Sequence, residues 1–332
     1  MNYEEFKNYV MEHIKEYLPE SFKDAELKIL SLKKNQVTKD GLNLRQKGSK
    51  IAVNLYMEEF FRRYQNGEEM PGILTAMANV FQERCPKELE DFDYSSFLKY
   101  DVVKDLIIPV LMGVKNNEDY QESHPSRVVA GDMFVSYKIA KDESKQYTIP
   151  ITNELANLIG VNEEELYNQA LRNINKDDVC IEDMSNVTKR MLMPQLLEMV
   201  NGDEAAANEM FEKVCSIPDE NKHKTLYVVT TSGKNQGASV MISQEIMDKV
   251  AKEAGGDLLI IPSSIHEIIA MKVGTEPVEN LKSMVCETNT TSVQDEDKLT
   301  DNVYAYNSET RELTTVDEYL DKKKDEQDFE LN

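Results

Sequence analysis

Hydrophobic residues recur at helical spacing at the start of the chain. Phe6, Val10, Ile14 and Leu18 are four positions apart, and Pro19 follows them. This spacing places the four side chains on one face of a helix, which the proline cannot continue. We therefore expect an amphipathic helix that ends before residue 19.

Short apolar runs divided by turn residues come next. The runs are Leu27–Leu32, Leu42–Leu44 and Ile51–Leu55, and the dividing pairs are Asp40-Gly41 and Gly48-Ser49. Such pairs are typical of hairpin turns, so the pattern predicts a three-stranded antiparallel meander. Beyond it we expect helices over Met57–Tyr64 and from Pro71 to Phe81, and a helix interrupted at Pro109 within Val102–Val114, with a buried strand as the alternative.

The second half of the chain alternates between predicted strands and helices. A polar stretch, Asn116–Pro125, precedes it. The predicted strands are Met133–Ile139 paired with Gln146–Ile151, then Leu226–Thr230, Ala238–Ile242, Leu258–Ile261 and Glu267–Val273. The predicted helices are Thr152–Ile159, one capped by Asn162, two within Val187–Val214 joined at Asn201-Gly202, and one capped by Ser243 and ended by Gly255-Gly256.

These elements predict an α+β fold. Residues 1–116 would form an N-terminal lobe with a small antiparallel meander plus helices. Residues 126–316 would form a C-terminal lobe with a mixed sheet flanked by helices. Residues 317–332 are charged and almost free of apolar side chains, so we expect a frayed helix end or a disordered tail there.

Composition narrows the possible partners. Lys and Arg number 38 and Asp and Glu 61, so the formal net charge is −23. A charge of this sign repels nucleic-acid phosphates and anionic membranes, although it also permits an acidic inhibitor that imitates DNA. The first residues show no secretory signal, no apolar run approaches the roughly 20 residues that span a bilayer, and the four cysteines form no C-x-x-C pair. We expect a cytoplasmic protein.

Only one segment carries candidate chemistry. The chain has no G-x-G-x-x-G, G-x-x-x-x-G-K-[ST] or G-x-S-x-G motif, so the sequence indicates no cofactor. The segment Pro262–Glu267 follows a predicted buried strand and contains Ser263, Ser264, His266 and Glu267. His-Glu begins the zinc motif H-E-x-x-H, but Ala270 occupies the second histidine position, so no metal site is expected.

Two interpretations of this segment stay open. A serine nucleophile needs a base and an orienting acid, and Ser263 or Ser264 with His266 would supply the first two. In the favoured interpretation, the segment is a turn and His266 binds backbone carbonyls or a carboxylate. A cluster of basic residues, Lys33–Lys50, could receive a phosphate or an acidic partner, although the solvated face of a hairpin is the favoured interpretation. Without interleaved aromatic residues the cluster does not support nucleic-acid binding.

Several stretches together resemble a known bacterial family, domain of unknown function 5688 (DUF5688). They are Lys39–Leu44, Val53–Glu58, Glu163–Ala170, Gly237-Ala238, Leu258–Glu267 and Asp301–Tyr304. The Pro-Ser-Ser-x-His-Glu block is the most specific of them. Asp132 also matches the family pattern, whereas His124 is displaced, since it precedes Pro125 where the family tends to have Pro-His. The resemblance implies no activity, but it adds weight to Ser263, Ser264, His266 and Glu267.

The sequence therefore favours a cytoplasmic interaction or regulatory protein without catalysis, acting on a protein partner. The alternatives are a hydrolase that uses Ser263 or Ser264 with His266 and a carboxylate such as Asp132, and an acidic inhibitor of a nucleic-acid enzyme.

Overall fold

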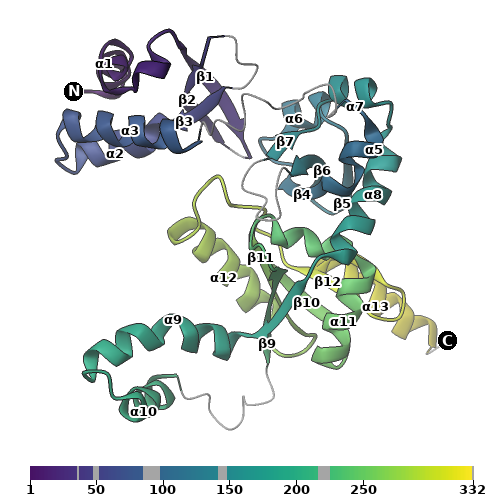
Figure 1. Cartoon of the computed structure of the whole chain (residues 1–332). Helices are drawn as coiled ribbons and strands as arrows, with labels where there is room; N and C mark the ends of the chain where they lie inside the picture. The colour runs from purple at the N-terminus through teal and green to yellow at the C-terminus, as the bar shows by residue number, and fades with distance from the viewer. Residues whose placement is uncertain (36, 48–51, 85–97, 141–147, 216–224, 331–332) are drawn as a thin grey trace. The chain divides into compact units, whose positions relative to one another are not determined.

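The chain divides into two compact units, residues 1–96 and 97–332 (Figure 1). The structure is a computed structural model that describes every residue except 36, 48–51, 85–97, 141–147, 216–224 and 331–332. The division lies earlier than the predicted link at 116–125, because strand β4 (Ile107–Gly113) pairs with β6 (Met133–Ala140) across that link.

The first unit is a three-stranded antiparallel meander packed against helices, as predicted. Its elements are α1 (Tyr3–Tyr17), η1 (Glu20–Phe22), β1 (Glu26–Lys34), β2 (Val37–Arg45), β3 (Val53–Tyr56), α2 (Met57–Gln65) and α3 (Met70–Arg84). The core combines one face of the sheet with the apolar stripes of the helices. Its largest buried side chains are Phe6, Ile14, Leu42, Leu44, Met57, Ile73, Leu74 and Phe81.

The predicted turn at Asp40-Gly41 is wrong. Both residues lie inside β2, where Gly41 pairs with Leu30, and β1 ends instead near Asn35, whose φ is 48°. A Cβ on Gly41 would lie 2.3 Å from Leu32 Cδ1, so the glycine makes room for a neighbouring leucine rather than for a turn. The other predicted turn, Gly48-Ser49, lies outside the described residues.

The second unit begins with a small antiparallel sheet. Strand β6 pairs with β4, with β5 (Ser126–Ala130) and with β7 (Thr148–Pro150). The helical elements here are α5 (Tyr100–Val103), η3 (Lys104–Leu106), α6 (Glu118–Ser123), α7 (Asn153–Ile159) and α8 (Glu163–Lys176). Strand β4 replaces the helix expected around Pro109, because its seven residues are all buried and a proline is tolerated on an edge strand.

The larger sheet has six strands in the order β13-β12-β10-β11-β9-β8. They are β8 (Val179–Asp183), β9 (Leu226–Thr231), β10 (Leu258–Ser264), β11 (Glu267–Lys272), β12 (Tyr304–Asn307) and β13 (Glu312–Thr315). Every pairing among the described strands is antiparallel, so this lobe has two antiparallel sheets where a mixed sheet was expected. The α+β class is confirmed.

Helices flank the large sheet. They are η5 (Gly237–Ile242), α11 (Gln244–Ala254), α12 (Val278–Thr291) and α13 (Val316–Glu330). The predicted caps of α8 and α11 are confirmed, since Asn162 accepts from Glu165 N and Ser243 from Ile246 N. The predicted strand Ala238–Ile242 is instead the fully buried 3₁₀ helix η5, because a short apolar run does not distinguish a strand from a buried helix.

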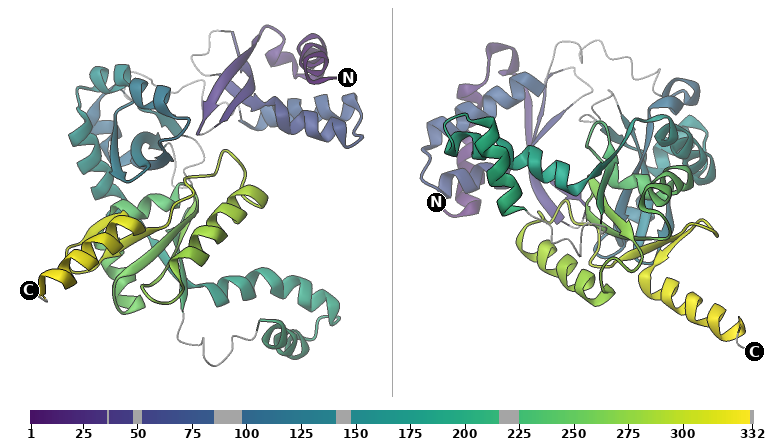
Figure 2. Two further views of the ribbon diagram at one scale, coloured as in Figure 1. Left: turned by 180° about the vertical axis from the view of Figure 1, so that it is seen from behind. Right: turned by 90° about the horizontal axis from the view of Figure 1, so that it is seen from below.

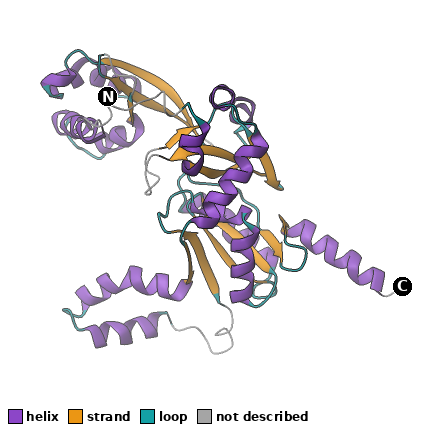
Figure 3. Cartoon of the chain, turned by 45° about the vertical axis from the view of Figure 1, so that its right-hand side comes forward, coloured by secondary structure: helices purple, strands orange, loops and turns teal. Residues whose placement is uncertain are grey.

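Two helices form an insertion between neighbouring strands. Helix α9 (Met184–Met199) follows β8 directly, and α10 (Glu204–Val214) returns beside it toward β9 (Figure 3). Asn201 and Gly202, both with positive φ, make the predicted link between them. We call this pair, residues 184–214, the helical arm.

The C-terminal segment is ordered as helix α13, the yellow helix in Figure 2. The tail expected over residues 317–332 is wrong for the first part of this segment, where Tyr319 is buried and its hydroxyl donates to Asp257 Oδ2 at 2.7 Å. In the part of the chain that the structure describes, no helix has both the length and the apolar character needed to cross a membrane.

Candidate functional site

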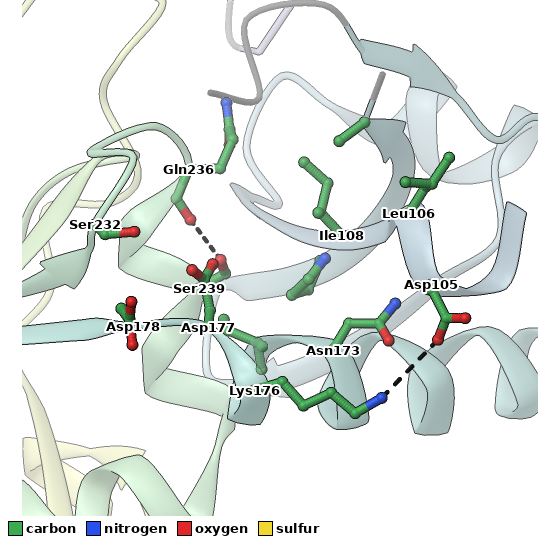
Figure 4. Close-up of a pocket in the computed structure, with 13 residues that line it drawn as sticks. Asp105, Leu106, Ile108, Asn173, Lys176, Asp177, Asp178, Ser232, Gln236 and Ser239 are labelled. Atoms are coloured by element: carbon green, nitrogen blue, oxygen red, sulfur yellow. Dashed lines mark hydrogen bonds and ion pairs between the residues drawn. The ribbon is translucent and has the colours of Figure 1, made fainter. Parts of the chain in front are cut away.

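A cavity of about 600 Å³ opens in the second unit (Figure 4). It lies where the C-terminal end of α8, the start of β4 and the loop after β9 meet. Its lining residues are Asp105, Leu106, Ile108, Pro109, Ala140, Asn173, Ile174, Lys176, Asp177, Asp178, Ser232, Gln236 and Ser239. A cavity of this size is typical of small-molecule sites.

The charged side chains of this lining are mainly acidic. Asp105, Asp177 and Asp178 are the acidic residues of the lining, and Lys176 is the one cation among the lining residues that the structure describes. Lys176 Nζ lies 3.9 Å from Asp105 Oδ1, and both side chains are largely exposed, so this ion pair is weak. Five apolar residues also line the cavity, Leu106, Ile108, Pro109, Ala140 and Ile174, together with the uncharged polar residues Asn173, Ser232, Gln236 and Ser239. The cavity therefore combines negative charge with hydrocarbon surface.

The loop after β9 supplies the polar part of the cavity. Ser232 N donates to the carbonyl of Asp178 at 2.8 Å, and the Ser239 hydroxyl donates to the carbonyl of Gln236. Lys234 and Gln236 both have left-handed backbones, with φ of 50° and 57°, a conformation that is costly for residues other than glycine. Such strain is commonly retained at functional sites.

One polar atom of this loop has no partner. Gln236 Oε1 is buried, and no described residue donates a hydrogen bond to it. Because a buried carbonyl oxygen without a donor costs about 1–3 kcal/mol, a ligand that donates a hydrogen bond here would recover that cost.

The Pro262–Glu267 block supports this loop from behind. Thr230 Oγ1 donates to the carbonyl of His266 at 2.7 Å, and Ala238 N donates to the carbonyl of Ile265 at 3.2 Å. Gly237 lies where the loop touches the block, because a Cβ on this residue would be 2.3 Å from the carbonyl oxygen of His266. The block that carries the family resemblance thus holds the cavity-lining loop in place.

The serines of the block do not contact the His266 ring in the way that a nucleophile requires. Ser264 Oγ accepts from the backbone N of His266 at 3.0 Å, and Ser263 is partly exposed where the register shifts between Pro262 and Ser264. Glu267 is partly exposed as well and pairs with Ser264 across the turn.

The His266 ring faces a carboxylate that sequence reasoning missed. Its Nε2 lies 3.5 Å from Asp297 Oδ1, and its side chain is 38% exposed. The backbone joins the same two segments, since Ile265 N donates to the Asp297 carbonyl at 2.8 Å. Asp297 lies in the polar stretch between α12 and β12, and no sequence signal links that stretch to the block.

Asp132 lies in a separate hydrogen-bond network. Its carboxylate accepts from Thr300 Oγ1 at 2.6 Å and from the Tyr304 hydroxyl. Burial alone would raise the pKa of Asp132, but these hydrogen bonds outweigh burial and hold the pKa below its usual value. Burial and the bond to Asp132 raise the pKa of Tyr304. Asp132 therefore links the β5–β6 turn to β12 rather than orienting His266.

Two residues of the basic cluster in the first unit contact their own neighbours. Arg45 pairs with Glu26 at 2.5 Å, and Lys39 lies over the Tyr56 ring at 5.4 Å. Lys50 lies outside the described residues.

The cavity residues themselves were missed by the sequence reasoning. One sequence signal could have indicated them: the polar run Ser232–Gln236 follows a buried strand, as the Pro262–Glu267 block does. Nothing in the sequence joined this run to Asp105 or Asp178.

Comparison with known proteins gives one match. The model of a family of unknown function, DUF5688, matches residues 3–308. No curated protein and no solved structure matches the chain.

Proposed function

The chain belongs to the DUF5688 family, and from its cavity we propose that it is a cytoplasmic regulatory protein without catalysis that binds a small aliphatic amine. The observation that carries the proposal is the composition of the cavity, in which carboxylates and an unpartnered carbonyl oxygen surround apolar surface.

An amine fits each part of this lining. Ammonium groups donate hydrogen bonds, so Asp105, Asp178 and Gln236 Oε1 are suitable acceptors for them. A hydrocarbon chain between two ammonium groups would contact the apolar side chains, such as Ile108 and Ile174. A diamine or polyamine therefore matches the cavity better than an anion or a neutral polar molecule.

The position of the cavity supports a regulatory role. Asp178 immediately precedes β8 and Ser232 immediately follows β9, so the cavity lies at one end of this antiparallel strand pair. The helical arm is inserted at the other end, after Asp183. A ligand that orders the cavity end of these strands would act on the segment that carries the arm.

Titration calorimetry with 1,4-diaminobutane tests the proposal. We expect 1,4-diaminobutane to bind the intact protein, whereas its neutral analogue 1,4-butanediol and the dianion succinate do not. Asp178→Asn removes a charged acceptor and should weaken amine binding by about tenfold or more.

The control separates this site from general attraction to an acidic chain. Asp24→Asn makes the same change of charge at an exposed residue of the first unit and should leave the affinity unchanged. Equal losses in both variants, or equal binding of the diamine and the diol, would refute the proposal.

Gln236→Gly separates ligand binding from stability. The substitution removes the amide, and it relieves a left-handed backbone at φ 57°. We expect weaker amine binding with a melting temperature that is unchanged or raised. Unchanged amine affinity would show that this amide does not contact the ligand.

The two other functions stay predictions. A hydrolase would need a serine hydroxyl on the His266 ring; Asp297 lies 3.5 Å from Nε2, as an orienting acid would, but the buried Nδ1 has no hydrogen-bond partner among the described residues. An inhibitor that imitates DNA would need a continuous acidic face, which competition for a nucleic-acid enzyme would test.

A further inference from the structure

The helical arm exposes large apolar side chains. Met191 and Met199 on α9 are 70% and 66% exposed, and Val214 at the end of α10 is 68% exposed. Of the sixteen residues of α9, only Leu196 is buried. Large apolar side chains of both helices of the arm are therefore left uncovered by the described residues of the second unit.

These exposed residues are not needed for the arm's own packing. The arm has a small core of Leu196, Ala207 and Phe211, with Asp183 and Asp203 capping its helices. Because that core is formed by other side chains, the exposure of Met191 and Met199 suits the binding of something outside this unit.

The charges around the exposed residues indicate what would bind. Of the arm's three cations, Arg190 and Lys213 are held in ion pairs of 2.6 Å with Glu182 and Glu209. The third, Lys189, lies over the Phe211 ring at 5.5 Å. Glu198 and Glu212, next to Met199 and near Val214, are exposed and have no ion pair among the described residues. Negative charge therefore borders the apolar surface.

We propose that the helical arm binds an amphipathic helix of a partner protein, in which lysine or arginine residues flank an apolar stripe. Methionine side chains adapt to different apolar shapes, which suits the docking of a helix. Met191 and Met199 are eight residues apart, about 12 Å along α9, so they span roughly two turns of such a helix.

The net charge argues against two other occupants. A second copy of this chain would bring together two molecules with a charge of −23 each. An anionic lipid surface would be repelled in the same way. A basic partner is attracted instead. A regulatory role for this docking rests on the proposed function. The binding of the helix itself is measured in the absence of amine.

The test uses a synthetic 18-residue peptide of leucine and lysine, with the leucines at helical spacing, and fluorescence anisotropy on the full chain. We expect the intact protein to bind this peptide and to bind a leucine–glutamate peptide of the same pattern far more weakly. The double variant Met191→Glu/Met199→Glu should bind the basic peptide at least about tenfold more weakly and keep its melting temperature.

Met284→Glu is the matched control, because Met284 is an exposed methionine, at 53%, on α12. It should bind the basic peptide like the intact protein. An equal loss in this control, or equal binding of the acidic peptide, would overturn the proposal. So would a dimer of the intact protein that the double variant dissolves, since a second copy would then be the occupant. Failure of amine binding would leave these results unchanged.

Discussion

Gly237→Ala tests whether the Pro262–Glu267 block holds the cavity-lining loop. The added Cβ would lie 2.1 Å from Thr230 Oγ1, 2.3 Å from the His266 carbonyl oxygen and 3.0 Å from Thr231 N. The first two distances are far inside normal contact and the third is tight, and two of the three atoms belong to the backbone of different segments. The alanine can therefore be accommodated only if the loop and the turn move apart.

The cost follows from the contacts that this movement breaks. Overpacking of a tight site costs about 1–3 kcal/mol. The hydrogen bond from Thr230 to the His266 carbonyl, 2.7 Å long, contributes about 0.5–1.5 kcal/mol and would be weakened or lost. We expect a loss of about 2–4 kcal/mol, which lowers the melting temperature of a unit of this size by roughly 5–15 °C.

The assay is thermal unfolding followed by calorimetry. The transition of residues 97–332 should move, while that of residues 1–96 should not, because Gly237 lies in the second unit. Gly72→Ala in α3 is the control, since its nearest atom would be 3.4 Å away and the transition of the first unit should be unchanged or slightly raised.

Two results would refute the reasoning. A melting temperature within about 2 °C of the original would show that the loop does not rest on the turn. Full recovery in the double variant Thr230→Ala/Gly237→Ala would show that only the threonine side chain is in conflict, whereas we expect partial recovery at most because the contact with the His266 carbonyl persists.

Three further predictions concern stability. His266→Ala should cost about 1 kcal/mol or less in urea unfolding, because its pair with Asp297 is partly exposed. An intact fold that has lost a hydrolytic activity would instead favour catalysis. Hydrogen bonds hold the pKa of Asp132 below its usual value, so the stabilisation by its carboxylate is present above about pH 4 and is lost as the pH falls through the lowered pKa. Asp132→Asn should therefore flatten the dependence of unfolding free energy on pH below about pH 4. An unchanged pH profile would contradict this. Deletion from Asp321 onward should shift the melting temperature by only about 1–2 °C, whereas a deletion that also removes the buried Tyr319 should lower it by several degrees; equal effects would place the docking contacts elsewhere.

The sequence alone determined the elements whose signals are local. The helical spacing of Phe6, Val10 and Ile14 predicted α1, and the caps Asn162 and Ser243 predicted the starts of α8 and α11. The meander of the first unit, the strand pair β10–β11 and the helices of the arm were also predicted. Periodicity and capping depend on neighbours in the chain, so one sequence contains them.

Features that depend on residues distant in the chain became visible in the folded structure. Gly41 was predicted as a turn because the leucine beside it could not be foreseen, and Pro109 was predicted as a helix break because an edge-strand position is not visible in sequence. Ala238–Ile242 has the same apolar composition whether it forms a strand or η5.

The candidate site followed the same rule. The sequence located His266 and its block, but Asp297 reaches the ring only through the fold. Likewise, Asp105, Asp178 and Gln236 come from three separate segments that the two antiparallel sheets and α8 bring around one cavity. Local patterns decide which elements form, whereas pairing and burial between distant segments decide which side chains meet.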